Sequence, residues 1–266
     1  MPPLVLERTK YLPALEGKTW EPAENEEDEN NSLDSKARLL IKREKFDVSI
    51  ILQESDKKSK YELFQRLNTG GSSLSPQEVR NCILVMLNRD MYVWLRRLAN
   101  YQNFRDTVSL TDRAIEEQYD MELVLRFIIF RTMPVDQLSN LEDVNDFLTE
   151  KMSAIAELVE FDYALETKAF EDTFDLLFNL TKESTFKRYD LNKSKFLGGF
   201  LLSAFETVAI GIGYSAINPL LQRENIVDKI KNIWINRDFE KYSGSGVRAS
   251  SRVPKLIPLG RTIFAS

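Results

Sequence analysis

The stretch that decides the fold of this chain is Met121-Glu122-Leu123-Val124-Leu125-Arg126-Phe127-Ile128-Ile129-Phe130-Arg131. Thr111 is a good N-cap residue for a helix that would run to Arg131, and beyond Met121 apolar side chains surround that helix on all sides. A helix that is apolar all round belongs at the centre of a bundle. We therefore expect a mainly α protein, a multi-helix bundle built around this segment.

Helical periodicity extends outward from this segment in both directions. Ser75-Pro76-Gln77-Glu78 predicts a capped helix start, with Ser75 at the N-cap and Glu78 closing a capping box. In that helix we expect a buried stripe of Val79, Cys82, Ile83 and Met86, with Gln77, Arg80 and Asn81 together on another face. Further helices are predicted at 33–43, 61–67, 143–163, 167–182, 195–211 and 219–234, and a β-branched run predicts one strand at 46–53.

Composition and charge suggest three parts. Residues 1–55 form a short α+β segment with an acidic, disordered loop at 21–31, and residues 56–240 form the helical domain. Residues 241–266 are a Gly/Ser-rich segment that carries five cations and no carboxylate, although the chain as a whole has a net charge of −5. With no apolar leader and no long apolar run, the expected location is the cytoplasm, without membrane contact.

The absence of histidine restricts the chemistry. The chain has no histidine and one cysteine, Cys82, which argues against a His-metal nuclease, a Ser-His-Asp triad and a structural zinc. Gly211-Ile212-Gly213 is better explained as a helix stop than as a dinucleotide motif, because no strand is predicted before it. Carboxylates at Asp112 and Glu116 are expected in a first helical turn. We therefore predict no catalytic and no metal-binding residues in this chain, and no bound cofactor.

A second stretch resembles a known family. This stretch reads Phe64-Gln65-Arg66-Leu67-Asn68-Thr69-Gly70-Gly71, followed by Leu74 and Gln77-Glu78-Val79-Arg80-Asn81. It is similar to the signature of the DGQQR-motif family. That family includes the GmrS-type N-terminal domains of nucleotide-dependent restriction enzymes, which have a ParB/sulfiredoxin-like front. The segment that follows the DGQQR helix in the family resembles Leu12-Pro13-Ala14-Leu15-Glu16-Gly17-Lys18-Thr19-Trp20 of this chain. The DGQQR pentapeptide itself is absent from these residues.

The resemblance implies a fold and a set of partners. Residues 1–55 would be the remnant of a ParB/sulfiredoxin-like domain, and the chain would correspond to the C-terminal portion of a GmrS-like protein. For the intact family it implies NTP and Mg²⁺. For this chain it implies a missing N-terminal half or a homologous subunit as partner, and a truncated or self-standing chain that is inactive alone.

The signature also implies binding residues. A Gly-Gly turn followed by a helix N-terminus presents N–H groups suited to phosphate, although a helix, a turn and a second helix need no ligand. The residues that the resemblance assigns to a nucleotide or phosphate are Arg66, Asn68, Gly70, Gly71, Gln77, Glu78, Arg80 and Asn81.

The C-terminal segment has two possible interpretations. Its cations, Arg248, Arg252, Lys255 and Arg261, match a nucleic-acid backbone and would bind DNA with little sequence specificity. Alternatively, it is a return segment that packs Ile257, Leu259, Ile263 and Phe264 on the bundle.

Two main functional hypotheses follow. In the first, the chain is a component of a phage-defence restriction system that binds DNA or nucleotide together with its missing catalytic half. In the second, it is a catalytically silent interaction or regulatory module that docks an intact homologue. A carboxylate-metal nuclease built on Asp112, Glu116, Glu117 and Asp120 is a third possibility, which rests on that cluster alone.

Overall fold

The computed structural model describes residues 4–7, 11–20, 31–45, 74–139, 141–215 and 225–265. The chain divides into two compact units, residues 1–60 and residues 61–266. The predicted strand at 46–53, the predicted helix at 61–67 and residues 21–30 of the acidic loop lie outside the described residues. Signature residues Arg66, Asn68, Gly70 and Gly71 lie outside them as well.

The described residues of the first unit contain a 3-10 helix, an α-helix and two isolated backbone bridges. A 3-10 helix, η1 (Pro13–Leu15), precedes α1 (Ser35–Arg43), which confirms the helix predicted at 33–43. Asp34 caps α1, because its carboxylate accepts a hydrogen bond of 2.6 Å from the backbone N–H of Ala37. Thr19 bridges to Val5 on one side and to Ser32 on the other. The relation of this unit to a ParB/sulfiredoxin-like domain stays a prediction.

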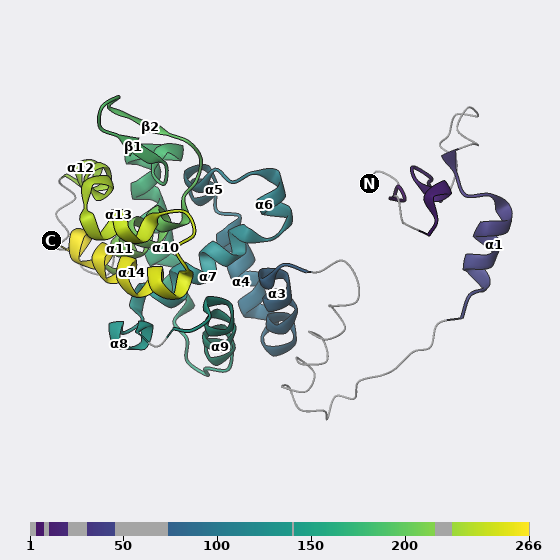
Figure 1. Cartoon of the computed structure of the whole chain (residues 1–266). Coiled ribbons are helices and arrows are strands. Elements are labelled where there is room, and N and C mark those ends of the chain that lie inside the picture. The colour runs from purple at the N-terminus through teal and green to yellow at the C-terminus, as the bar shows by residue number, and fades with distance from the viewer. Residues whose placement is uncertain are drawn as a thin grey trace. The chain divides into compact units, whose positions relative to one another are not determined.

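The second unit is mainly helical, as predicted, and its described residues include a small antiparallel hairpin (Figure 1). Its first half consists of α3 (Pro76–Leu87), α4 (Arg89–Ala99), α5 (Gln102–Val108), α6 (Asp112–Glu116), α7 (Tyr119–Thr132), α8 (Val135–Leu138) and α9 (Val144–Ala156). The second half consists of α10 (Tyr163–Thr181), η3 (Lys182–Ser184), β1 (Arg188–Asp190), β2 (Lys195–Leu197), α11 (Leu202–Ser215), α12 (Ile226–Asn232), η4 (Ile233–Ile235), α13 (Arg237–Ser243) and α14 (Ala249–Ala265).

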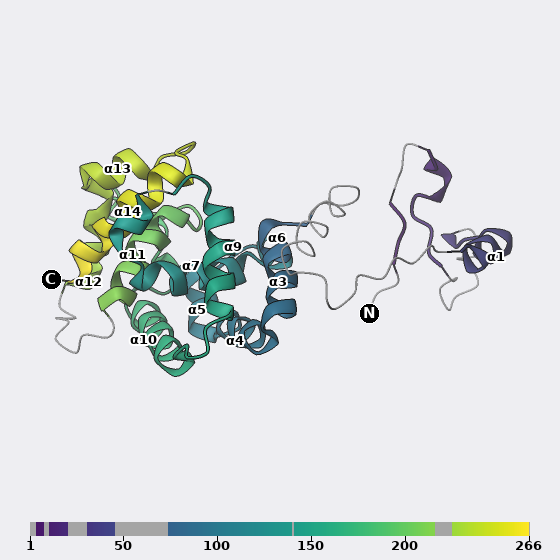
Figure 2. The ribbon, with the colours of Figure 1, turned by 90° about the horizontal axis from the view of Figure 1, so that it is seen from below.

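Helix α7 lies at the centre of this unit, as its sequence predicts. All its residues from Met121 to Arg131 are buried, and it contacts α3, α4, α9, α10 and α11 (Figure 2). Phe127 packs edge-on against Phe170 of α10, with 5.3 Å between ring centroids. The core therefore forms around α7, and the polar residues of this helix must find partners inside the protein.

Several predicted helix boundaries are wrong. The helix expected from Thr111 to Arg131 is two helices, because Gln118 adopts a left-handed conformation (φ 60°) between α6 and α7. The helix expected at 195–211 begins instead at Leu202. Residues 195–197 pair with β1, and Gly198 turns the chain at φ 82°. Helix α9 ends at Ala156, seven residues before the predicted end at 163.

The C-terminal segment is a helix packed on α11 rather than an irregular tail. Gly260 of α14 lies against Thr207 of α11 so closely that a Cβ atom at Gly260 would be 2.0 Å from the Thr207 carbonyl oxygen. Gly211 packs against the Gly260 backbone in the same way: a Cβ atom added at Gly211 would lie 2.5 Å from the Gly260 carbonyl oxygen. Ile257 and Phe264 are buried. This agrees with the alternative in which the segment returns to the bundle.

No helix among the described residues is long and apolar enough to cross a lipid bilayer.

Candidate functional site

Helix α3, which carries the second half of the family-like signature, starts as predicted. The Ser75 hydroxyl accepts a hydrogen bond from the Glu78 backbone N–H (3.2 Å), and the Glu78 carboxylate accepts one from the Ser75 backbone N–H (2.7 Å). Pro76 occupies the first helical position, where a missing N–H costs nothing. The predicted capping box is confirmed.

The buried face of α3 is not the predicted one. Met86 is 55 % exposed and Val79 and Cys82 are half-buried, so of the predicted apolar stripe only Ile83 is fully buried. Gln77 and Arg80 are each 1 % exposed, and Asn81 is 8 % exposed. The polar face is turned inward because the buried carboxylate of Glu122 on α7 needs a cation as its partner, and Arg80 supplies one.

Arg80 is held by a set of short hydrogen bonds. Its Nη2 atom is 2.6 Å from Glu122 Oε2, and its Nε donates to Gln77 Oε1 at 2.8 Å. The Gln77 amide in turn donates to Asn81 Oδ1 at 2.9 Å, and Arg80 Nη1 reaches Asn145 Oδ1 of α9 at 3.4 Å. The structure therefore places Gln77 and Arg80 in the interior, where they join α3 to α7 and α9.

Glu122 is the first carboxylate of a longer buried chain of charges. Its other oxygen accepts from Arg126 Nε at 2.9 Å, one helical turn along α7. Arg126 Nη1 donates to Glu206 Oε1 of α11 at 3.1 Å. Arg252 of α14 completes the chain, with Nε 2.7 Å from Glu206 Oε2 and Nη2 3.2 Å from Oε1. We call Arg80, Glu122, Arg126, Glu206 and Arg252 the charge chain.

The charge chain is electrostatically coupled. Burial by itself would lower the pKa of Arg126, but Glu122 and Glu206 outweigh that effect and the pKa is raised. The nearby phenol of Tyr119 has its pKa raised, mainly by burial. Arg126 thus remains charged and bound, and removing any one member of the charge chain would leave a buried charged neighbour with one partner fewer.

The four predicted nucleic-acid contacts are divided between interior and surface. Arg252 pairs with Glu206, as above. Arg261 donates from Nη2 to the carbonyl oxygens of Phe130 and Met133, at 2.7 Å each, and its guanidinium lies 4.6 Å from the Tyr214 ring centroid. These contacts hold α14 to the C-terminal end of α7.

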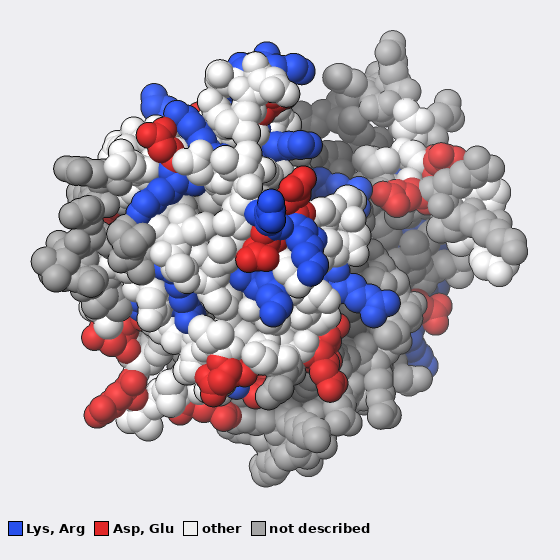
Figure 3. All heavy atoms as spheres, turned by 60° about the vertical axis from the view of Figure 1, so that its left-hand side comes forward, with Lys and Arg blue, Asp and Glu red and all other residues white. Residues whose placement is uncertain are grey.

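Arg248 and Lys255 are exposed, as are several other cations between residue 182 and the end of α14. Among the described residues from 182 onward, cations outnumber carboxylates. The exposed cations there are Lys182, Arg188, Lys193, Lys195, Arg237, Lys241, Arg248 and Lys255, which we call the basic surface. Figure 3 shows the side of the unit on which α12–α14 lie, where lysines and arginines gather around a few acidic side chains.

A cavity of about 500 Å³ opens beside the capped start of α3. Glu78 and Asn81 of the signature line it together with Asp120, Arg96, Cys82 and seven others: Leu74, Tyr92, Ala99, Asn100, Ile115, Gln118 and Met121. Burial raises the pKa of the Asp120 carboxyl. Burial, with the Glu78 carboxylate, also raises the pKa of the Cys82 thiol, so that this thiol is a poor nucleophile near neutral pH.

The described signature residues do not fit a nucleoside triphosphate. The guanidinium of Arg80 is directed to Glu122, and the cavity beside α3 has two carboxylates, Glu78 and Asp120, against one arginine, Arg96. Phosphate groups require the opposite balance of charge. Within the described residues, no group of three or more His, Cys, Asp or Glu side chains is arranged to hold a metal ion.

Sequence reasoning missed the acceptors in this network: Glu122, Glu206 and Asn145. Two of them carried a signal, because Glu122 and Glu206 are carboxylates inside otherwise apolar helical runs. A charge in such a position is rarely buried without a partner, so these two carboxylates indicate cations on neighbouring helices.

Comparisons with protein-family models, with curated proteins and with solved structures found no match for this chain.

Proposed function

We propose that the helical unit binds the phosphate backbone of DNA, as the non-catalytic part of a phage-defence restriction system like the one its sequence resembles. The observation that carries this proposal is the basic surface on a chain whose net charge is −5. Positive charge concentrated on one part of an acidic protein is the electrostatic feature expected of a nucleic-acid contact.

The β1–β2 hairpin is the clearest element of the basic surface. Its strands pair Arg188 with Leu197 and Asp190 with Lys195, and Lys193 lies in the exposed turn between them. Lys231 of α12 lies over the ring of Tyr189, 5.7 Å from its centroid, which ties the hairpin to the helices beside it. A supported hairpin with three exposed cations can follow a phosphate backbone without reading bases.

Binding should be weakly sequence-specific and strongly dependent on salt. Cations that contact phosphates release condensed counterions, and the affinity therefore falls steeply as salt is raised. We expect no hydrolysis of nucleoside triphosphates and no DNA nicking by the purified chain, since it has neither histidine nor DGQQR.

Fluorescence anisotropy with duplex DNA of random sequence, titrated at several salt concentrations, tests the proposal. Replacing Arg188, Lys193 and Lys195 together by Glu should weaken binding by about tenfold or more and reduce the salt slope by roughly one for each lost phosphate contact. The matched control replaces three exposed arginines of α4 and α5, Arg89, Arg96 and Arg105, by Glu, with the same change in net charge. Equal losses in both variants, or no salt-dependent binding at all, would reject the proposal.

A second candidate is a protein-interaction module. It is favoured by α1 of the first unit, none of whose residues is buried and whose Leu39, Leu40 and Ile41 are 47 %, 63 % and 52 % exposed. Several large apolar side chains exposed on one short helix are typical of a segment that binds another protein. Sedimentation of the chain and of a Leu40→Glu variant tests this candidate: a complex or self-association lost in the variant supports it, and a monomer in both cases does not.

A further inference from the structure

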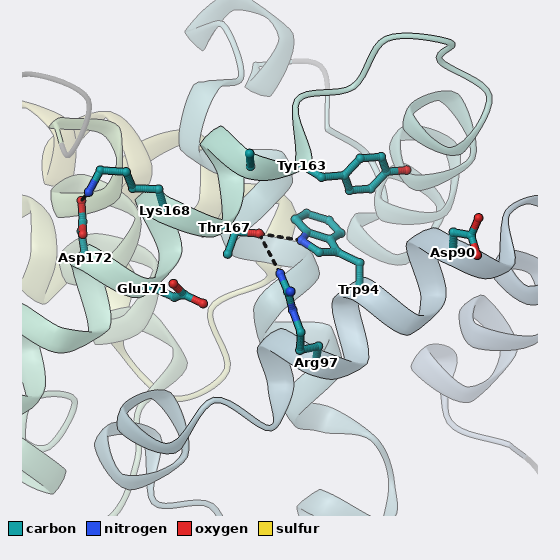
Figure 4. A pocket seen from close by; sticks show the side chains of 9 residues that line it. Asp90, Trp94, Arg97, Tyr163, Thr167, Lys168, Glu171 and Asp172 are labelled. Atoms are coloured by element: carbon teal, nitrogen blue, oxygen red, sulfur yellow. Dashed lines mark hydrogen bonds and ion pairs between the residues drawn. The ribbon is translucent and has the colours of Figure 1, made fainter.

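A second cavity, of about 740 Å³, lies between α4 and α10, and none of its lining residues belongs to the signature or to the basic surface. Its volume is within the range of small-molecule sites. Trp94 and Tyr163 form its aromatic wall, with ring centroids 5.0 Å apart and an interplanar angle of 83°. Phe161 packs edge-on against both rings. Figure 4 shows the side chains that line it.

Thr167 is the central polar group of this cavity. Its hydroxyl oxygen accepts a hydrogen bond from Trp94 Nε1 at 2.8 Å and another from Arg97 Nη2 at 3.2 Å (Figure 4). A threonine hydroxyl has two lone pairs and one proton, so both acceptor positions are used and only the proton is left to donate. None of the hydrogen bonds among the described residues takes up that proton.

Arg97 adds further donors at the same place. Of the five N–H groups of a guanidinium, one is bound to Thr167, and Arg97 is exposed and makes no ion pair within 4.0 Å among the described residues. A hydroxyl donor and a guanidinium side by side form a site for an oxyanion, above all a carboxylate, which a guanidinium can bind through two parallel hydrogen bonds.

Glu171 lies one turn beyond Thr167 on the same face of α10 and also lines the cavity. It forms no ion pair among the described residues, whereas its neighbours Lys168 and Asp172 pair with each other at 2.7 Å. The carboxylate of Glu171 is therefore available to a ligand cation at the end of the cavity where Arg97 is found. Asp90 lies two turns before Arg97 on α4, roughly 10 Å away along that helix.

We propose that this cavity binds a free α-amino acid with an aromatic or large apolar side chain. The ligand carboxylate would contact Arg97 and Thr167, its ammonium group Glu171, and its side chain the wall formed by Trp94 and Tyr163. The donors of Arg97 and Thr167 and the carboxylate of Glu171 would bind the two charges of a zwitterion. The aromatic rings, which lie between these groups and Asp90, would contact its apolar side chain. This inference does not depend on DNA binding.

Isothermal titration calorimetry with L-phenylalanine, with N-acetyl-L-phenylalanine and with L-phenylalaninamide tests the assignment of each group. The free amino acid should bind best, because the acetyl derivative lacks the ammonium group and the amide lacks the carboxylate. Equal binding of all three compounds, or no binding of L-phenylalanine at millimolar concentration, would overturn the proposal.

Variants distinguish the site from non-specific association. Arg97→Gln should weaken L-phenylalanine binding by roughly tenfold or more, since a charged hydrogen bond is lost. Arg96→Gln, the neighbouring exposed arginine outside the cavity, should leave it unchanged. Thr167→Ser keeps the donor and should bind normally, whereas Thr167→Val should not. If Arg97→Gln and Arg96→Gln bind equally well, the carboxylate assignment is wrong.

A spectroscopic readout supports the calorimetry. Trp94 is one of three tryptophans, so a ligand against its ring should change the intrinsic fluorescence of the protein. The change should disappear in a Trp94→Phe variant and persist when Trp234 is replaced by Phe. A fluorescence change that survives in Trp94→Phe would place the ligand elsewhere and reject the site.

Discussion

Arg80 of α3 and Arg126 of α7 bind opposite oxygens of the same buried carboxylate, that of Glu122. The two arginines are 1 % and 5 % exposed, so neither can exchange this partner for water without opening the helical unit. Through Glu206 and Arg252 the same alternation of charge continues to α14. The interior of this protein is thus organised by ions as well as by apolar packing.

The first prediction concerns this shared carboxylate. Glu122→Ala should lower the free energy of unfolding by about 3–5 kcal/mol, because it removes the carboxylate that the buried cations of Arg80 and Arg126 share and leaves Arg126 with Glu206 alone. Glu117→Ala, which removes the partner of the exposed Arg113, should cost far less, because water screens that pair. Chemical denaturation of the two variants measures both values, and similar costs would show that the buried pairings contribute little.

The second prediction concerns the contact between α14 and α11. Gly260→Ala places a methyl group where the Thr207 carbonyl oxygen already lies, and the helices must separate to admit it. We expect a loss of about 1–3 kcal/mol, typical of overpacking. Gly244→Ala is the matched control, since the nearest atom to its added Cβ would be Val247 Cγ2 at 3.9 Å. Thermal unfolding of both variants compares them directly.

The third prediction is a loss of stability at alkaline pH. Burial, together with a 2.5 Å hydrogen bond to Asp175, raises the pKa of the Tyr101 phenol to about 12. Below pH 10 the phenol is protonated in both the folded and the unfolded chain, and its stabilising contribution is complete. As pH rises from about 10 to about 12, the unfolded chain loses this proton first, so the contribution is lost.

Denaturation of wild type and Tyr101→Phe across this pH range isolates the contribution of Tyr101. The stability advantage of wild type over the variant should shrink between about pH 10 and 12. The difference between their tyrosinate absorbance titrations should show one phenol that ionises late. A constant difference in stability would mean that Tyr101 titrates normally.

The fourth prediction concerns the single thiol. Because burial and the Glu78 carboxylate raise the pKa of Cys82, its rate of alkylation by iodoacetamide should rise only at a pH above that of an ordinary cysteine. The same chain in denaturant serves as control, since the unfolded thiol has neither effect. With one cysteine in the chain, mass spectrometry reports the rate without ambiguity. Identical pH profiles in the two states would contradict the cause given.

The sequence predicted the elements whose signals are local. The apolar stretch from Met121 to Arg131 could only be a central helix, and Ser75 with Glu78 marked a helix start that the structure confirms. The break at Gln118 had no such signal, because neither glycine nor proline occurs there and the left-handed turn is imposed by the packing of α6 and α7.

Features that depend on distant partners were not predictable in the same way. Gln77, Arg80 and Asn81 look like an exposed polar face until Glu122, some forty residues later, is placed beside them. Pro254, Pro258 and Gly260 are typical of irregular chain, yet they lie within α14, where Gly260 permits close contact with α11. The cavity between α4 and α10 likewise combines residues about seventy positions apart.

The position of α14 also has a consequence for biosynthesis. Arg252 neutralises Glu206, and Arg261 binds the end of α7, yet both belong to the last of the described helices to leave the ribosome. Until then, the nascent helices can collapse, but Glu206 Oε2 and the final carbonyl oxygens of α7 must stay hydrated. The helical unit should therefore reach its native state only after translation of α14, and ribosome-bound chains that stop before Arg252 should remain sensitive to protease.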